Sequence, residues 1–252
     1  MGVPKPTPIF LEINHYRNIY EAFRIWYSFG DFDIPKKNVL LHVSSADVIY
    51  EYYCLLNIYE SLFELGYKEE KEKRKLHKYS ISDPRYVNTS DDNTYYFINN
   101  QSSVVLYFQP VIYSGDSNTK NDIELFRTDG KYYTPDFVIK HIDAKNVVSY
   151  GIFDAKWRNR NVLLKQETAG GLRDTVYKYY HSIRSSTSLL PCKFLWLLEG
   201  KDDPVYIRSY THNNGSFSRK QDDDFRYSTG IVRVTPKSGV YEMTQVLSKF
   251  LD

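Results

Sequence analysis

Cysteine is scarce in this chain of 252 residues, which contains only Cys54 and Cys192. Both lie in apolar stretches and neither belongs to a Cys-x-x-Cys pair, so we expect two buried free thiols. This scarcity argues against a disulfide framework and against a cysteine-based zinc site, because both need more cysteines at closer spacing.

Long apolar runs are missing as well. The chain has no stretch of about 18 uninterrupted apolar residues, which argues against a membrane-spanning helix. The segment Met1–Pro8 contains lysine and proline in place of an apolar core, so we expect no signal peptide. These absences predict a soluble, cytoplasmic protein without a membrane partner.

The chain also lacks a strong excess of charge and a nucleotide-binding loop. It has 33 basic and 31 acidic residues and a net charge of +2, so any surface that binds nucleic acid must be local. Gly130 and the Gly170-Gly171 pair do not form a Walker-type G-x-x-x-x-G-K-[ST] sequence. We therefore expect any NTPase motor to be a separate chain.

Helical and extended patterns alternate along the chain, without a repeat or a clear domain boundary. Apolar spacing predicts helices over residues 11–29, 46–65, 168–185 and 241–251. Short apolar runs predict strands over residues 39–43, 95–98, 104–113, 194–198 and 231–234. The polar segments expected on the surface are 67–79, 114–122 and 212–228. This order predicts one domain over residues 1–252 with a mixed α/β core.

Two apolar segments in the middle of the chain carry charged residues. Residues 134–139 contain Pro135-Asp136, and residues 151–157 contain Asp154-Ala155-Lys156. Alternate side chains of a strand share a face, so Asp154 and Lys156 point to the same side. A buried charge must be paired or must bind a metal. An acid and a lysine, with a second acid in reach, therefore predict a divalent-cation site and phosphodiester hydrolysis.

The order of these residues resembles the PD-(D/E)xK nuclease signature, with Pro135-Asp136 as its first part and Asp154-Ala155-Lys156 as its second. The likeness is greatest to the nuclease domain of McrC-type restriction proteins and their relatives, through residues 16–27, 49–54, 153–157 and 174–180. It covers residues from about 11 to 198. The resemblance implies a restriction-endonuclease-like fold, with a mixed β-sheet core flanked by α-helices, and a metal-dependent endonuclease that hydrolyses DNA.

The resemblance assigns a metal-binding role to Asp136, whose plainer interpretation is an aspartate that caps a turn at the start of a strand. Asp154 lies between Phe153 and Ala155, where an acid needs a neutralising cation, and the carbonyl of Ala155 is a further predicted ligand. Mg²⁺ suits these hard oxygen ligands better than zinc or copper, and Mn²⁺ is expected to substitute. Lys156 is predicted to orient or activate the attacking water, or to stabilise charge on the phosphate.

Glu51 is a further acid with a predicted role in the site. On a helix it aligns with Leu55, Ile58 and Leu62, an apolar stripe that should face the core. The resemblance implies a helical glutamate near the metal. The alternative is a peripheral glutamate that reaches solvent past the stripe.

Contacts with nucleic acid are predicted for residues on two segments beside the motif. Arg158 and Arg160 follow the second strand and are candidates for phosphate contacts, although they also suit a solvated strand end. Arg173, Lys178 and Tyr180 lie on the predicted helix 168–185, where the resemblance implies a polar or basic residue that contributes to the site.

The expected function is DNA cleavage within a restriction or anti-phage defence system. A McrB-like NTPase motor or a target-recognition subunit would then be a separate partner, and a homodimer stays open. Two other classes also stay open: a catalytically inactive nuclease-like module that binds DNA or acts as a scaffold, and a nuclease directed at RNA.

Overall fold

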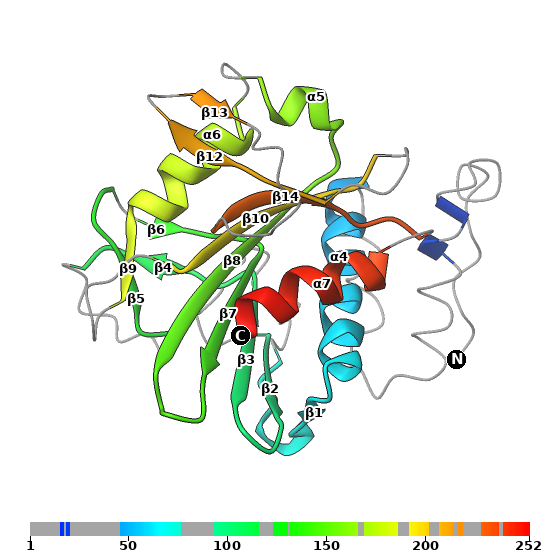
Figure 1. The fold of residues 1–252 in the computed structure, drawn as a ribbon, viewed down its shortest axis with the longest axis vertical. Helices are drawn as coiled ribbons and strands as arrows, with labels where there is room; N and C mark the ends of the chain where they lie inside the picture. The colour runs from blue at the N-terminus through cyan, green and yellow to red at the C-terminus, as the bar shows by residue number, and fades with distance from the viewer. Residues whose placement is uncertain are drawn as a thin grey trace, which may run out of the picture.

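A mixed sheet forms the centre of the part of the chain that the structure describes (Figure 1). The strands lie in the order β1 (Lys68–Glu69), β2 (Thr94–Ile98), β3 (Ser103–Phe108), β7 (Phe137–Ile142), β8 (Val148–Lys156), β10 (Phe194–Glu199), β14 (Thr229–Arg233) and β11 (Ile207–Ser209). This computed structural model describes residues 16–17, 19–20, 46–76, 93–115, 123–130, 132–165, 169–185, 192–201, 207–213, 216–218, 228–236 and 239–252. The prediction of a mixed α/β core is confirmed.

The sheet changes from antiparallel to parallel at β8. Strands β1, β2, β3, β7 and β8 pair antiparallel in turn, whereas β8, β10 and β14 run parallel to one another. Parallel strands bring their carboxyl ends to the same edge of a sheet. Lys156, Glu199 and Arg233 therefore form one row across that edge, since the register pairs Glu199 with both of the others.

Helices cover both faces of the sheet. On one face, α4 (Ala46–Glu64) and α7 (Gly239–Leu251) pack against Phe153, Trp196 and Val232. On the other face, α6 (Leu172–Thr175) and the π-helix η2 (Val176–His181) pack against Ile152 and Leu197. A short helix, α5 (Arg160–Leu163), adds Leu163 to that second cluster. Both faces are apolar because successive residues of β8 and β10 alternate between the two clusters.

Three two-stranded ladders and a short helix complete the described structure. The ladders join β4 (Ile112–Tyr113) to β6 (Tyr132–Tyr133), β5 (Leu125–Arg127) to β9 (Ile183–Ser185), and β12 (Thr211–Asn213) to β13 (Ser216–Ser218). The 3₁₀ helix η1 (Lys71–Lys73) follows β1. Among the described helices, none is long and apolar enough to cross a membrane.

Several predicted elements are confirmed. The predicted helices 46–65 and 241–251 correspond to α4 and α7, and α4 stops before Gly66, whose φ of 83° suits a glycine at a helix end. The predicted strands 95–98, 194–198 and 231–234 correspond to β2, β10 and β14. Cys54 and Cys192 are buried and free, as expected.

Two predicted elements are wrong in their extent. The strand predicted over 104–113 breaks after β3, because Gln109 takes a left-handed φ of 51° and Pro110 has no N–H for a ladder. The helix predicted over 168–185 ends at His181, and Ile183–Ser185 instead pairs as β9 with β5. That pairing depends on a distant segment, which the local apolar spacing does not reveal.

Other predicted elements lie partly or wholly outside the described residues. Of the helix predicted over 11–29, only residues 16–17 and 19–20 are described, and they are helical. The strand predicted over 39–43 lies outside the described residues. The polar segments 67–79, 114–122 and 212–228 are described in part, and the last of these contains β13 and most of β12.

Candidate active site

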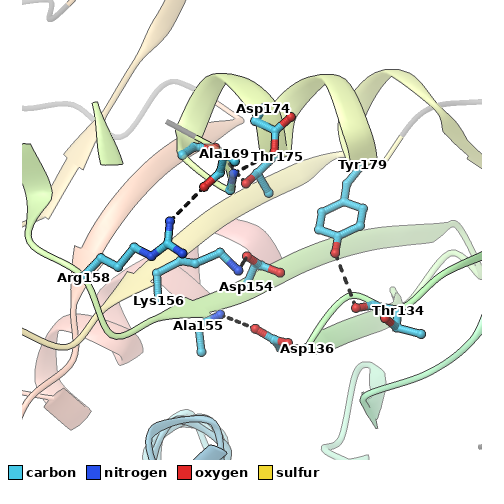
Figure 2. Close-up of polar contacts among 12 residues, drawn as sticks. Thr134, Asp136, Asp154, Ala155, Lys156, Arg158, Ala169, Asp174, Thr175 and Tyr179 are labelled. Atoms are coloured by element: carbon cyan, nitrogen blue, oxygen red, sulfur yellow. Dashed lines mark hydrogen bonds and ion pairs between the residues drawn. The ribbon is translucent and has the colours of Figure 1, made fainter. Parts of the chain in front are cut away.

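Asp136 and Asp154 lie opposite each other at one end of the β7–β8 hairpin. The register pairs Phe137 with Phe153, so the next position outward places Asp136 opposite Asp154. Directly opposed residues of an antiparallel pair share a face of the sheet. Figure 2 shows the two carboxylates and the Lys156 side chain gathered in this region. The sequence-based prediction that these residues share one site agrees with this arrangement.

Each aspartate has a defined contact within the hairpin. Oδ2 of Asp136 accepts a hydrogen bond of 2.6 Å from the backbone N–H of Ala155 (Figure 2). Because β7 begins only at Phe137, the Asp136 side chain satisfies this N–H beyond the last paired residues. Asp154 is only 3% exposed, and its Oδ2 makes an ion pair with the ammonium of Lys156. Lys156 therefore forms its ion pair inside the site itself.

Glu51 reaches the same cluster from α4, on the other face of the sheet. Its neighbours on the apolar stripe, Leu55, Ile58 and Leu62, are buried as predicted. Oε2 of Glu51 accepts a hydrogen bond of 2.5 Å from the side-chain amide of Gln109. The carboxylate is therefore held by a side chain of the protein, and its role in a metal site stays a prediction.

The charges of the cluster act on one another. Burial raises the pKa of Asp136 well above its usual range, and the charges of Asp154 and Glu51 raise it further. Burial also raises the pKa of Glu51, although the Gln109 amide and Lys156 oppose that shift. Burial alone would lower the pKa of Lys156, but Asp154, Asp136 and Glu51 outweigh it, so its pKa is raised. Three acids thus share one lysine, so acidic groups outnumber basic ones in the cluster.

Tyr179 lies beside the candidate site, at helical spacing with Leu172, Val176 and Ile183 on the helix predicted over 168–185. It is 2% exposed, and its hydroxyl donates a long hydrogen bond of 3.4 Å to the carbonyl of Thr134. Figure 2 shows the ring reaching from its helix toward the end of the hairpin. Burial raises the pKa of Tyr179, and the charges of Asp154 and Asp136 add to the shift. The available signal was a tyrosine in an apolar stripe next to the motif.

Arg158 and Arg160 follow β8, but their hydrogen bonds go to Ala169 and Glu199, outside the group of Asp136, Asp154 and Lys156. The exposed Arg158 donates a hydrogen bond of 2.8 Å to the carbonyl of Ala169, in the loop that leads into α6 (Figure 2). The backbone N–H of Arg160 donates to Oε1 of Glu199 at 2.7 Å. These contacts hold the two segments beside the site, and neither of them involves Asp136 or Asp154. The predicted phosphate contacts stay predictions.

The candidates on the predicted helix 168–185 point to other partners. The guanidinium of Arg173 lies 5.8 Å from the centre of the Tyr177 ring. The ammonium of Lys178 lies 4.6 Å from the centre of the Tyr179 ring. The hydroxyl of Tyr180 accepts a hydrogen bond of 3.2 Å from Ser228. The π-helix changes the spacing of side chains along this segment. On this segment, Tyr179 is the residue whose pKa is raised by burial and by the charges of Asp154 and Asp136.

The chain matches no protein-family model, no curated protein and no solved structure.

The described residues contain no group of three or more His, Cys, Asp or Glu side chains arranged to hold a metal ion. Instead, the Asp136 carboxylate accepts a hydrogen bond from the backbone N–H of Ala155, and the Asp154 carboxylate forms an ion pair with Lys156. The chemistry of the donors nevertheless fits a hard divalent cation, because Glu51, Asp136 and Asp154 supply carboxylate oxygens, and burial together with the charges of Asp154 and Glu51 raises the pKa of Asp136. Mg²⁺ and Mn²⁺ fit this set, and the Ala155 carbonyl stays a predicted ligand.

Asp136→Asn should stabilise the metal-free protein. The folded-state pKa of Asp136 is raised above its unfolded value, so the carboxylate destabilises the fold as pH rises from the unfolded pKa through the folded one. Asparagine keeps an oxygen acceptor for the Ala155 N–H and removes the charge. At pH 8 with EDTA we expect the melting temperature to rise by about 2–4 °C, the shift that about 1 kcal/mol gives in a chain of this size.

The pH dependence provides the check on that substitution. The gain should disappear near pH 3, where the parent carboxylate is protonated in both states. Asp252→Asn, at the exposed end of the chain after α7, serves as a control that should change little at either pH. A lower melting temperature for Asp136→Asn at pH 8 would show that the Asp136 charge stabilises the fold.

Proposed function

We propose that this chain is a metal-dependent endonuclease of the PD-(D/E)xK type, which hydrolyses phosphodiester bonds in DNA. The observation that supports this most is the opposition of Asp136 and Asp154 across the β7–β8 hairpin, with Lys156 paired to Asp154. The motif order and a mixed sheet between helices support a restriction-endonuclease-like arrangement. In this proposal Glu51 is the fourth residue of the site.

The electrostatics support distinct roles for the charged residues. Lys156 has a raised pKa and therefore stays a cation near neutral pH. It is suited to orient a water molecule or to stabilise charge on a phosphate, and it is unsuited to act as a base. In the metal-free protein burial raises the pKa of Asp136 and of Glu51, so both acids would gain from a cation that stabilises their charged forms. A bound Mg²⁺ would neutralise the acids and lower the pKa of a coordinated water.

The proposed setting is a restriction or anti-phage defence system in which this chain supplies the cutting activity. A separate McrB-like NTPase or a target-recognition subunit would direct it to DNA. We propose that two arginines contact the phosphate backbone of the DNA: Arg158, beside the loop at Ala169, and Arg173 on α6. Both are cationic and lie on segments next to the site. Arg160, Lys178 and Tyr180 are kept as further candidates on the same two segments.

Cleavage of supercoiled plasmid DNA tests this function directly. We expect nicked and linear DNA with Mg²⁺ or Mn²⁺ and intact plasmid with EDTA. Single-stranded DNA and RNA of matched sequence are tested as well. Cleavage of RNA alone would show that the chain is a nuclease directed at RNA. If none of the three substrates is cut with either metal, the proposed nuclease activity is wrong.

A further inference from the structure

Gln109 contacts two of the acids of the site: Asp136, just before β7, and Glu51 on α4. The register pairs Phe108 with Phe137, so Gln109, one residue beyond β3, lies opposite Asp136. Its backbone N–H donates a hydrogen bond of 2.7 Å to the carbonyl of Asp136. This bond extends the β3–β7 ladder by one position and fixes the backbone of Asp136 from the side away from Asp154.

The backbone of Gln109 turns its side chain toward α4. Phe108 packs in the cluster that contains α4, so a regular strand would direct the next side chain to the opposite face. Gln109 instead has a φ of 51°, in the left-handed region that side chains other than glycine rarely adopt. With this backbone its amide reaches Oε2 of Glu51 at 2.5 Å. Such conformations concentrate at functional sites, where surrounding contacts maintain them.

The contact has a clear chemical consequence. A side-chain amide that donates to a carboxylate favours its charged form and restricts its rotamers. Glu51 needs this support, because it shares the site with two other acids. Gln109 thus ties the acid of α4 to the strand that carries Asp136, through one side-chain bond and one backbone bond.

We propose that Gln109 is a positioning residue that holds the Glu51 carboxylate toward Asp136 and Asp154, so that the three acids can bind one divalent cation. This inference depends on the proposed metal-dependent function, and it adds a residue outside the acid and lysine motif. Gln109 acts through Glu51 and takes no part in the reaction itself.

Two substitutions separate the side-chain bond from the backbone bond. Gln109→Met keeps the length of the side chain and removes its donor. Gln109→Gly suits the left-handed backbone and keeps the N–H that binds Asp136. Mn²⁺ affinity of the metal-free chain, measured by electron paramagnetic resonance, should fall about tenfold or more in both, as for residues that orient ligands of a metal. The Mg²⁺ concentration that gives half-maximal cleavage should rise in parallel. Gln101→Met, on an exposed turn, is the control and should match the parent.

A double-substitution cycle identifies the route of the effect. In a Glu51→Gln background, Gln109→Met should weaken Mn²⁺ binding no further, because its only proposed target has lost its charge. If both Gln109 variants bind Mn²⁺ as the parent does while the parent cleaves DNA, the inference is wrong and the proposed function stands. An undiminished effect in the Glu51→Gln background would also overturn it. A parent that neither binds Mn²⁺ nor cleaves would overturn the proposed function and this inference together.

Discussion

Asp154→Ala is expected to reduce metal-dependent DNA cleavage by at least about 10³-fold, because several kcal/mol of transition-state stabilisation depend on the metal and its activated water. Asp154 is buried at the centre of the proposed site, and its Oδ2 touches the ammonium of Lys156. The loss should appear in kcat, measured under saturating Mg²⁺ on supercoiled plasmid. Asp154→Asn, which keeps the shape of the side chain, should lose cleavage to a similar degree.

The fold should survive this substitution. Asp154 raises the pKa of Asp136, so its removal relieves a repulsion between two acids. Lys156 keeps Asp136 and Glu51 as charged neighbours. An unchanged circular dichroism spectrum and melting temperature would show that the fold is intact. The loss of cleavage would then come from the loss of a catalytic group.

A second ion pair that involves β7 provides a control. Lys140 on β7 pairs with Glu124 at 2.6 Å, at a distance from the acids along the strand. Lys140→Met breaks this partly buried ion pair, yet it should leave cleavage close to the parent rate. If Asp154→Ala cuts as fast as Lys140→Met, the chain has no nuclease centre at this position.

The two motif strands show what the sequence could predict. Alternation along the second strand correctly put Asp154 and Lys156 on one face, because that period is a property of any strand. The opposition of Asp136 and Asp154 depends on register, which the connecting turn sets. In that turn Oδ1 of Asp143 accepts hydrogen bonds from the N–H groups of Lys145 and Val147, both at 2.8 Å. One residue more or less in the turn would move the two acids to opposite faces.

The errors arose where distant segments decide the local structure. Apolar spacing over 168–185 indicated one regular helix, but the structure has a π-helix there, followed by β9, which pairs with the distant strand β5. Likewise, the left-handed backbone of Gln109 accompanies its bonds to Asp136 and Glu51, which are far away in the sequence, whereas Pro110 was a local signal against a continuous strand. Local propensity carries no information about such partners.

Glu199 and Arg233 form a buried ion pair that the sequence did not reveal. They end two strands whose parallel pairing brings them side by side, next to Lys156 in the same row. Glu199 is 0% exposed and Arg233 is 2% exposed. One guanidinium nitrogen of Arg233 donates to both carboxylate oxygens of Glu199, at 2.9 and 2.8 Å. The same carboxylate accepts the backbone N–H of Arg160, at the start of α5.

Arg233→Met should destabilise the protein by about 3–5 kcal/mol, the usual effect of leaving one partner of a buried pair without its countercharge. Glu199 would then be a buried carboxylate without its partner guanidinium. Urea denaturation of parent and variant measures this difference.

Two comparisons test the cause of that loss. Lys73→Met removes one partner of the exposed Lys73–Glu70 pair and should change stability by about 1 kcal/mol or less. Combining Glu199→Leu with Arg233→Met should recover part of the loss, because no buried charge is then left alone. The recovery should be incomplete, since the Arg160 N–H loses its acceptor. If Arg233→Met is as mild as Lys73→Met, the pair does not stabilise the carboxyl ends of the parallel strands, and the position of Lys156 must be maintained by Asp154 and the packing around it.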